Sequence, residues 1–161
     1  MRRFLLAIAM AVLALSAEAA AQQDYRRQLL GYLEHGLARH AELGYAAERT
    51  VPDLITPLQL DRPYLWSIYL LEGVNYRIYG ACDDDCGDLD MEIYSVDGNF
   101  LERDVARDDT PYVQITPAAT GRHYVRIWLY ACSAEPCYVA ARVVSGGQPV
   151  ERAADTAVQT P

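Results

Sequence analysis

Lysine is absent from this chain of 161 residues: all 14 basic residues are arginine, against 22 acidic residues, and the formal net charge is −8. Proteins that bind nucleic acids or anionic lipid surfaces need a basic footprint. The composition therefore argues against both as partners. Because 52% of the residues are hydrophobic and 22% are charged, we expect one globular domain rather than a disordered tail or a multi-span membrane protein.

Membrane-spanning apolar runs are also missing, since the run Phe4–Leu15 has only 12 residues, whereas a transmembrane helix needs about 20. A cationic start precedes this run and several small residues follow it, which is the pattern of a secretory signal peptide. We therefore predict a signal peptide over residues 1–21. The processed chain would have no transmembrane segment and would be periplasmic or secreted.

Catalytic motifs are scarce. The sequence has no Gly-x-Ser-x-Gly elbow, no His-Glu-x-x-His pair and no glycine-rich loop that opens a helix. These absences argue against nucleotide binding and predict that the protein is not an enzyme. A small hydrolase that uses Asp88 or His123 is the least favoured hypothesis.

The four cysteines form two close pairs, Cys82 with Cys86 and Cys132 with Cys137. Thiols oxidise after export, so we expect disulfides. Three pairings are possible, and we favour the two local ones because each pair brackets a turn-like insert. By the chain-entropy model each local bridge contributes about 2 kcal/mol. A four-thiolate zinc site is a less favoured alternative, because neither pair has the C-x2-C spacing.

Residues 22–47 have helical periodicity. One apolar stripe recurs at intervals of three and four residues and consists of Tyr25, Leu29, Tyr32, Leu33, Leu37, His40 and Leu43. Gly31 and Gly36 each cost about 1 kcal/mol relative to alanine, so this helix needs a docking surface. That surface is either the rest of the chain or a partner. Residues 48–54 are expected to form a linker.

From residue 55 to residue 144 the periodicity changes to two, which is typical of half-buried strands. The clearest alternation sets Val125, Ile127 and Leu129 against Tyr124, Arg126, Trp128 and Tyr130. Turn signals separate such segments, and no βαβ alternation occurs. We predict a mainly β domain, an antiparallel β-sandwich of seven or eight strands preceded by one N-terminal amphipathic helix. Residues 145–161 lack periodicity and are expected to be a disordered tail.

The predicted sandwich carries a set of residues that is characteristic of one family. The set comprises 73–78, Gly80, Cys82, Cys86, 88–90, 97–98, Asp104, 108–109, Pro111, 116–117, Gly121 and 124–127. On these positions, residues 55–144 resemble the bacterial pre-peptidase C-terminal domain. The resemblance implies a jelly-roll-like, non-catalytic sandwich that accompanies secreted enzymes and serves secretion, folding or substrate attachment. It also implies relatives that bind collagen, some of which hold calcium. The cysteine pairs are not general to that family.

Acidic residues are densest between the first cysteine pair and the strand that follows it. Clustered carboxylates on a clamped loop suit Ca²⁺, and the candidate ligands are Asp83, Asp85, Asp88 and Asp90. The spacing is not that of an EF-hand. Compensation of these charges by solvent and by arginines is the favoured alternative.

A second candidate site lies on the polar side of the last strands. It comprises Tyr112, Tyr124, Arg126, Trp128, Tyr130 and Tyr138. Aromatic and arginine side chains dominate interface hot spots and stack on sugar rings. Cross-strand pairing, or cover by the N-terminal helix, would also account for them, and cover by the helix is slightly favoured.

These observations lead to one main functional hypothesis and one alternative. The protein is expected to be an exported, non-enzymatic binding or structural module of the cell envelope that recognises a protein or glycan through its aromatic and arginine sheet face. The alternative is a calcium-stabilised accessory domain that acts beside a separate secreted peptidase or other enzyme.

Overall fold

The computed structural model describes residues 23–147. This part of the chain contains an N-terminal helix, residues 23–41, and nine β-strands. The strands are β1 (Tyr45–Ala47), β2 (Leu54–Leu58), β3 (Tyr64–Leu70), β4 (Tyr76–Cys82), β5 (Cys86–Tyr94), β6 (Phe100–Asp104), β7 (Tyr112–Ile115), β8 (Gly121–Cys132) and β9 (Cys137–Gly146). The predicted fold class is confirmed: the domain is mainly β and one helix precedes the strands.

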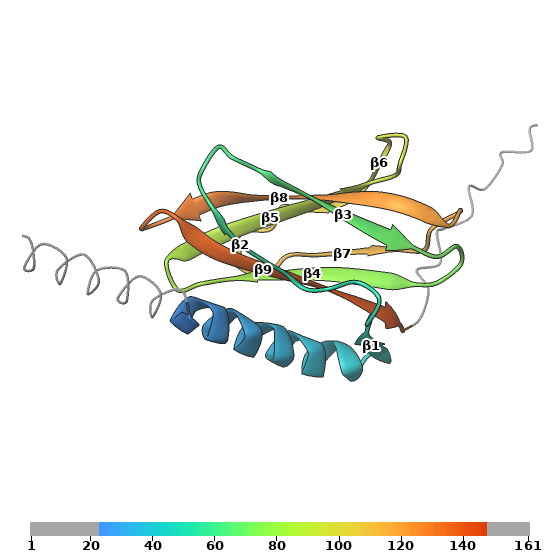
Figure 1. Cartoon of the computed structure of the whole chain (residues 1–161), viewed down its shortest axis with the longest axis horizontal. Coiled ribbons are helices and arrows are strands. Elements are labelled where there is room, and N and C mark those ends of the chain that lie inside the picture. Colours follow the sequence, from blue (N-terminus) through green and yellow to red (C-terminus); the bar gives the residue numbers. More distant parts are fainter. Residues whose placement is uncertain (1–22, 148–161) are drawn as a thin grey trace, which may run out of the picture.

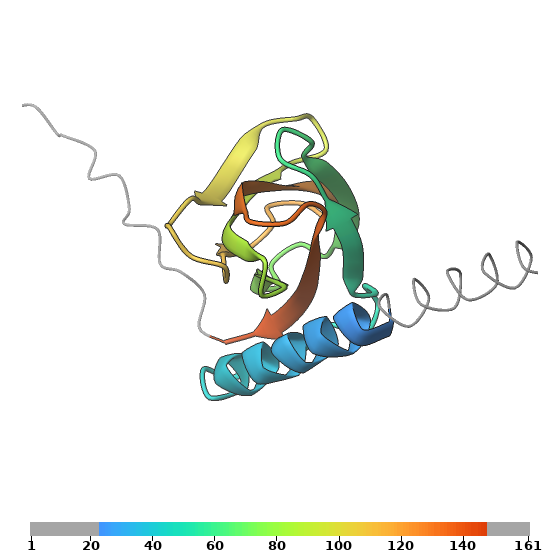
Figure 2. The same cartoon turned by 90° about the vertical axis from the view of Figure 1, so that its left-hand side faces the viewer.

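The strands form two antiparallel sheets. One sheet has the order β1-β9-β4-β7, with β2 also pairing with β9, and we call it the helix-side sheet. The other has the order β3-β8-β5-β6, and we call it the open sheet. Figures 1 and 2 show the two sheets stacked face to face, with the helix against the sheet that contains β9.

The main core lies between the sheets and follows from the period-two alternation. In β8, Val125, Ile127 and Leu129 are buried and face the opposite sheet. Strand β9 contributes Val139 and Val143, which are fully buried on the inner face of the helix-side sheet. Alternate residues of a strand lie on opposite faces of the sheet, so the remaining positions of β8 lie on the outside of the sandwich.

A second core lies between the helix and the helix-side sheet. Leu29 and Leu33 have no exposed surface and pack with Ala140 and Val144 of β9. The Tyr79 hydroxyl of β4 donates a hydrogen bond to the Leu33 carbonyl oxygen at 2.6 Å. The helix therefore docks on the sandwich itself, which supplies the surface that its glycines require.

The last turn of the helix packs through a histidine. The His40 ring lies 4.5 Å, centroid to centroid, from the Tyr79 ring. Burial, followed by the nearby charges of Arg77 and Arg39, lowers the pKa of His40 to about 4. His40 is therefore uncharged at neutral pH and packs as an aromatic side chain.

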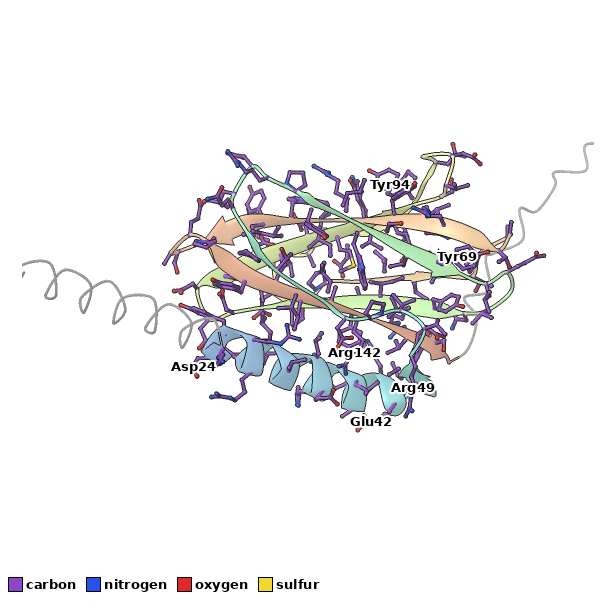
Figure 3. All side chains as sticks on the ribbon, viewed as in Figure 1. Asp24, Glu42, Arg49, Tyr69, Tyr94 and Arg142 are labelled. Carbon is purple, nitrogen blue, oxygen red and sulfur yellow. A yellow bond between two sulfur atoms is a disulfide. The ribbon has the colours of Figure 1, made fainter. Side chains whose placement is uncertain are left out.

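Arg142 of β9 connects the helix to the segment before β2. Its guanidinium binds both carboxylate oxygens of Asp53, at 2.8 and 2.7 Å, and one carboxylate oxygen of Glu34 on the helix, at 2.7 Å. Figure 3 places Arg142 beside the helix. Because Arg142 is buried, the two carboxylates provide the charge compensation that water would otherwise supply.

The end of the helix and the start of the first strand differ from the prediction. The helix ends at residue 41 rather than 47, and Tyr45–Ala47 form β1 instead. Gly44 has a φ of 85°, a left-handed conformation that ends the helix, and β1 then pairs with Val144–Gly146 of β9. This extra strand brings the count to nine. The same pairing extends the sandwich to Gly146, inside the segment predicted to be disordered.

The disulfides join Cys82 to Cys86 and Cys132 to Cys137, which is the local pairing predicted from the sequence. Each bridge spans the step from one sheet to the other, β4 to β5 and β8 to β9. Cys86 and Cys132 are also opposite each other in the β5–β8 ladder. The two bridges therefore lie together and fasten the sheets at one end of the sandwich.

Two carboxylates of β6 bind the backbone of β7 at the edge of the sandwich where these two strands face each other. Glu102 accepts a hydrogen bond from the Gln114 backbone N–H at 2.9 Å, and Asp104 accepts one from the Tyr112 N–H at 3.1 Å. These N–H groups belong to β7, which pairs only with β4 in the described structure. The free edge of β7 is thereby satisfied within the domain.

The predicted signal peptide, residues 1–21, lies outside the described residues, as does the predicted tail from residue 148 onward. Between residues 23 and 147, no helix combines the length and the apolar character needed to cross a membrane.

Candidate functional site

The outer face of the open sheet carries one continuous row of large polar and aromatic side chains. Because Val125, Ile127 and Leu129 point inward, the intervening residues of β8 point outward. This row, which we call the β8 row, consists of Arg122, Tyr124, Arg126, Trp128 and Tyr130. The helix covers the opposite sheet, so within the described structure no secondary-structure element covers the β8 row (Figure 2).

Arg126 is held at the centre of the row by two neighbours. Its guanidinium carbon lies 4.6 Å from the centroid of the Trp128 ring, and one guanidinium nitrogen lies 2.7 Å from a carboxylate oxygen of Glu92 on β5. Tyr94 donates a hydrogen bond to the same Glu92 oxygen. Trp128 and Glu92 thus fix the position of the Arg126 guanidinium, and Tyr94 in turn holds Glu92.

Glu92 remains ionised in this arrangement. Burial raises the pKa of Glu92, but hydrogen bonds from Tyr94 and Arg126, together with the charge of Arg126, lower it by more, so the pKa lies below its ordinary value. The cross-strand register explains the contact, since Glu92 lies directly opposite Arg126 in the β5–β8 ladder. Arg126 is therefore held in place at the surface, whereas the Glu92 carboxylate is buried beneath it.

Asp90 lies two residue pairs further along the same ladder, opposite Trp128 and on the same face as Glu92. It is only 5% exposed. Burial, and then the neighbouring carboxylates Asp88 and Asp104, raise the pKa of Asp90 to about 6, although a hydrogen bond with the Trp128 side chain lowers it. At neutral pH the domain therefore holds an unfavourable negative charge beneath the aromatic row.

Replacing Asp90 with asparagine is expected to raise the free energy of unfolding by about 1–2 kcal/mol at about pH 8 and to have little effect at about pH 4. A carboxyl group whose folded-state pKa is raised from 3.8 to about 6 stabilises the fold below pH 3.8, and that contribution is lost as the pH rises through 6. Urea unfolding at both pH values, in buffer with EDTA, measures the difference. Asp109→Asn, at an exposed aspartate, is the matched control and should change stability at neither pH. Equal stability of wild type and Asp90→Asn at the higher pH would contradict the prediction.

A depression adjoins the row where the connection between β2 and β3 passes close to β8. It has a volume of about 520 Å³ and is lined by Leu60, Asp61, Pro63, Arg126, Trp128, Leu129 and Tyr130. The exposed Tyr130 ring forms part of its wall. A side chain of a bound molecule could therefore insert next to the Arg126 and Trp128 pair.

The structure divides the predicted binding face between the two sheets. Tyr124, Arg126, Trp128 and Tyr130 lie together in the β8 row, as expected. Tyr112 and Tyr138 belong to the helix-side sheet. The Tyr138 ring stacks on the Tyr25 ring of the helix, with 4.6 Å between the ring centroids. The guanidinium carbon of Arg77 lies 4.5 Å from the centroid of the Tyr112 ring. The expectation that the helix covers the aromatic residues thus holds for Tyr138 but not for the β8 row.

Exposed apolar residues of β3 adjoin the β8 row and were not identified from the sequence. Leu65 and Tyr69 are opposite Arg126 and Arg122 in the β3–β8 ladder and are 58% and 61% exposed. Their alternation with buried Trp66 was visible in the sequence. The sequence does not show that β3 pairs with β8, and this pairing is what places Leu65 and Tyr69 beside the arginines.

The predicted calcium ligands lie in two different environments. Asp83 and Asp85 belong to the turn at the disulfide end. There Asp83 accepts a hydrogen bond from the Tyr138 N–H at 2.7 Å, and Ser133 donates to Asp85. Asp88 and Asp90 follow on β5. One carboxylate oxygen of Asp88, like one of Asp83, is buried without a hydrogen-bond partner in the described structure.

Across residues 23–147, the structure gathers no three acidic, histidine or cysteine side chains in a geometry that suits a metal ion. The four predicted ligands therefore do not share one site here. Calcium binding stays a prediction.

The described residues define a class of protein: a disulfide-fastened, two-sheet antiparallel β-sandwich with a helix on one sheet and an aromatic and arginine row on the other. No family model matches the sequence, and no curated protein matches it. Among solved structures, the pre-peptidase C-terminal domain of a collagenase from Bacillus anthracis is similar, with 10% sequence identity and a TM-score of 0.46. The match covers 57% of this chain and 87% of that domain, which belongs to the family that residues 55–144 resemble.

Proposed function

We propose that the protein is an exported binding module whose ligand is another protein, held by the β8 row. The signal-peptide pattern of residues 1–21 and the two disulfides support an oxidising compartment outside the cytoplasm. The observation that carries the binding function is the asymmetry of the two outer faces. The helix buries the outer face of one sheet, whereas the other outer face presents ordered arginine, tryptophan and tyrosine side chains to solvent.

The composition of the row favours a protein ligand. Tryptophan, tyrosine and arginine are the residues that most often dominate the energy of protein interfaces. Arg126 is already positioned by Glu92 and Trp128, so it loses little side-chain freedom on binding. The guanidinium of Arg126 already occupies one face of Trp128, which leaves less of this ring available for stacking on a sugar.

The charge of the face predicts an acidic ligand. Although the whole chain has a net charge of −8, Arg122 and Arg126 are both in the row, and Arg103 of β6 is opposite Glu92 in the neighbouring ladder. Glu92 and Asp90 on the same face are buried. A partner surface that combines carboxylates with an apolar side chain for the depression beside Trp128 fits these groups best.

The test is capture from culture fluid and envelope extract on immobilised protein, followed by calorimetry with each purified captured protein. We expect Arg126→Ala and Tyr130→Ala to weaken binding at least about tenfold. The matched control, Tyr112→Ala on the helix-side sheet, should leave affinity unchanged. Melting temperatures establish that each variant is folded. Binding that tolerates both β8 variants, or a ligand that is a polysaccharide, would overturn the proposal.

The alternative that calcium stabilises an accessory domain is favoured by one observation, the buried and unpartnered oxygen of Asp88. A bound cation would supply its missing partner. Melting temperatures in Ca²⁺ and in EDTA test this alternative: a rise with Ca²⁺ that Asp88→Asn abolishes would support it, and identical temperatures would exclude it.

A further inference from the structure

The sandwich has several strand edges, and most of them are protected against pairing with another chain. The edge of β7 is satisfied by Glu102 and Asp104. Strand β6 carries three charged residues among its five, and β2 contains Pro57, which has no N–H to donate. Charges, prolines and internal hydrogen bonds are the usual means by which proteins prevent edge-to-edge association.

Strand β3 has none of these protections. It forms one end of the open sheet and, among the described strands, pairs only with β8. Its seven residues, Tyr-Leu-Trp-Ser-Ile-Tyr-Leu, include no charged residue and no proline. Leu65 and Tyr69 project from its outer face and are largely exposed. Such an edge offers both unpaired backbone groups and apolar side chains to an incoming strand.

We propose that β3 pairs antiparallel with β3 of a second copy of this chain, so that the two open sheets join into one sheet of eight strands. A two-fold axis through such an edge requires the strands to be antiparallel and each residue pair to occur twice. With the axis at Ser67, the middle residue of β3, Leu65 lies opposite Tyr69 and Trp66 lies opposite Ile68. All of these cross-strand pairs are apolar.

Charges at the two ends of β3 fit the same register. Arg62 precedes the strand and Glu72 follows it, each five residues from Ser67, and both are exposed. In the proposed pairing Arg62 of one copy is therefore brought opposite Glu72 of the other, at both ends of the ladder. This complementarity is what distinguishes a second copy from an unrelated extended segment, because the strand itself carries no charge that would select a partner.

Dimerisation through the β3 edge also changes how the β8 rows are arranged. Joining the open sheets along β3 sets the two β8 rows on one side of a continuous sheet, related by the two-fold axis. The dimer does not depend on the proposed function. If that function holds, the dimer presents two binding rows to a repetitive or two-fold ligand.

Sedimentation velocity of the full chain over a range of concentrations tests the dimer. We expect wild type to dimerise reversibly, and we expect Ser67→Lys and Ser67→Glu each to raise the dimer dissociation constant at least about tenfold, because each brings like charges together on the axis. An equimolar mixture of these two variants should dimerise again. Far-UV circular dichroism and melting temperature verify that the variants remain folded, as expected for an exposed position.

Phe100→Lys, at an exposed position on the β6 edge, is the matched control and should not weaken the dimer. A wild-type chain that stays monomeric at every concentration would overturn the proposal. So would a dimer that tolerates both Ser67 variants, or one that Phe100→Lys disrupts. A monomer that instead binds an extended peptide along β3 would assign the edge to a different occupant.

Discussion

Replacing Arg142 with methionine is expected to lower the free energy of unfolding by about 2–3 kcal/mol, because its hydrogen bonds to two carboxylates are lost and the half-buried Asp53 keeps an uncompensated charge. The arginine is buried and binds Asp53 through two hydrogen bonds and Glu34 through one. Methionine retains most of the apolar stem but none of the donors. Equilibrium unfolding in urea measures the loss.

The two carboxylate partners of Arg142 should contribute unequally. The side chain of Asp53 is 25% exposed and that of Glu34 is 64% exposed. We therefore expect Asp53→Asn to cost clearly more than Glu34→Gln, which solvent screening should keep within about 1 kcal/mol of wild type. Equal costs for the two variants would contradict this unequal contribution, and a stable Arg142→Met variant would show that the ion pair does not hold the helix and the pre-β2 segment to β9.

Replacing Gly36 with alanine is expected to destabilise the protein by about 2–3 kcal/mol, even though alanine favours helix formation. A Cβ atom at position 36 would lie 2.5 Å from a ring carbon of Tyr79. That ring cannot move away cheaply, because it is buried and its hydroxyl is bonded to the Leu33 carbonyl oxygen. The helix would have to lift from the sheet or lose this bond.

Gly31 provides the matched control within the same helix. A Cβ atom there meets nothing within 4 Å, so Gly31→Ala should stabilise the protein by up to about 1 kcal/mol through helix propensity alone. The two substitutions are chemically identical and are expected to have opposite signs. Thermal unfolding of both variants, monitored by circular dichroism, provides the comparison. Stabilisation by Gly36→Ala would mean that the helix does not pack closely on β4.

The two glycines also mark the limit of sequence reasoning about the helix. Both were recognised as costs that require a docking surface, and the periodicity of Leu29 and Leu33 identified the buried side. Periodicity could not distinguish Gly36, which allows close approach of the Tyr79 ring, from Gly31, which faces open space. That difference arises from β4, which is distant in the sequence.

The candidate face was predicted in part for a similar reason. Alternation within β8 correctly identified Tyr124, Arg126, Trp128 and Tyr130 as sharing one side of a strand. The same reasoning added Tyr112 and Tyr138, whose strands alternate equally well but belong to the other sheet. Alternation reports which side of its own strand a residue occupies, and it carries no information about which strands are neighbours.

The sequence by itself determined the local properties of this protein: two-residue periodicity produced strands, apolar residues at intervals of three and four produced one amphipathic helix, and closely spaced cysteines produced two local bridges. The tertiary structure decided which sheet the helix covers, which aromatic residues remain exposed, and which edge remains unpaired. Those outcomes depend on contacts between segments far apart in the chain, such as Arg142 with Glu34 and β3 with β8. Such contacts form only when the whole chain excludes water from both of its cores.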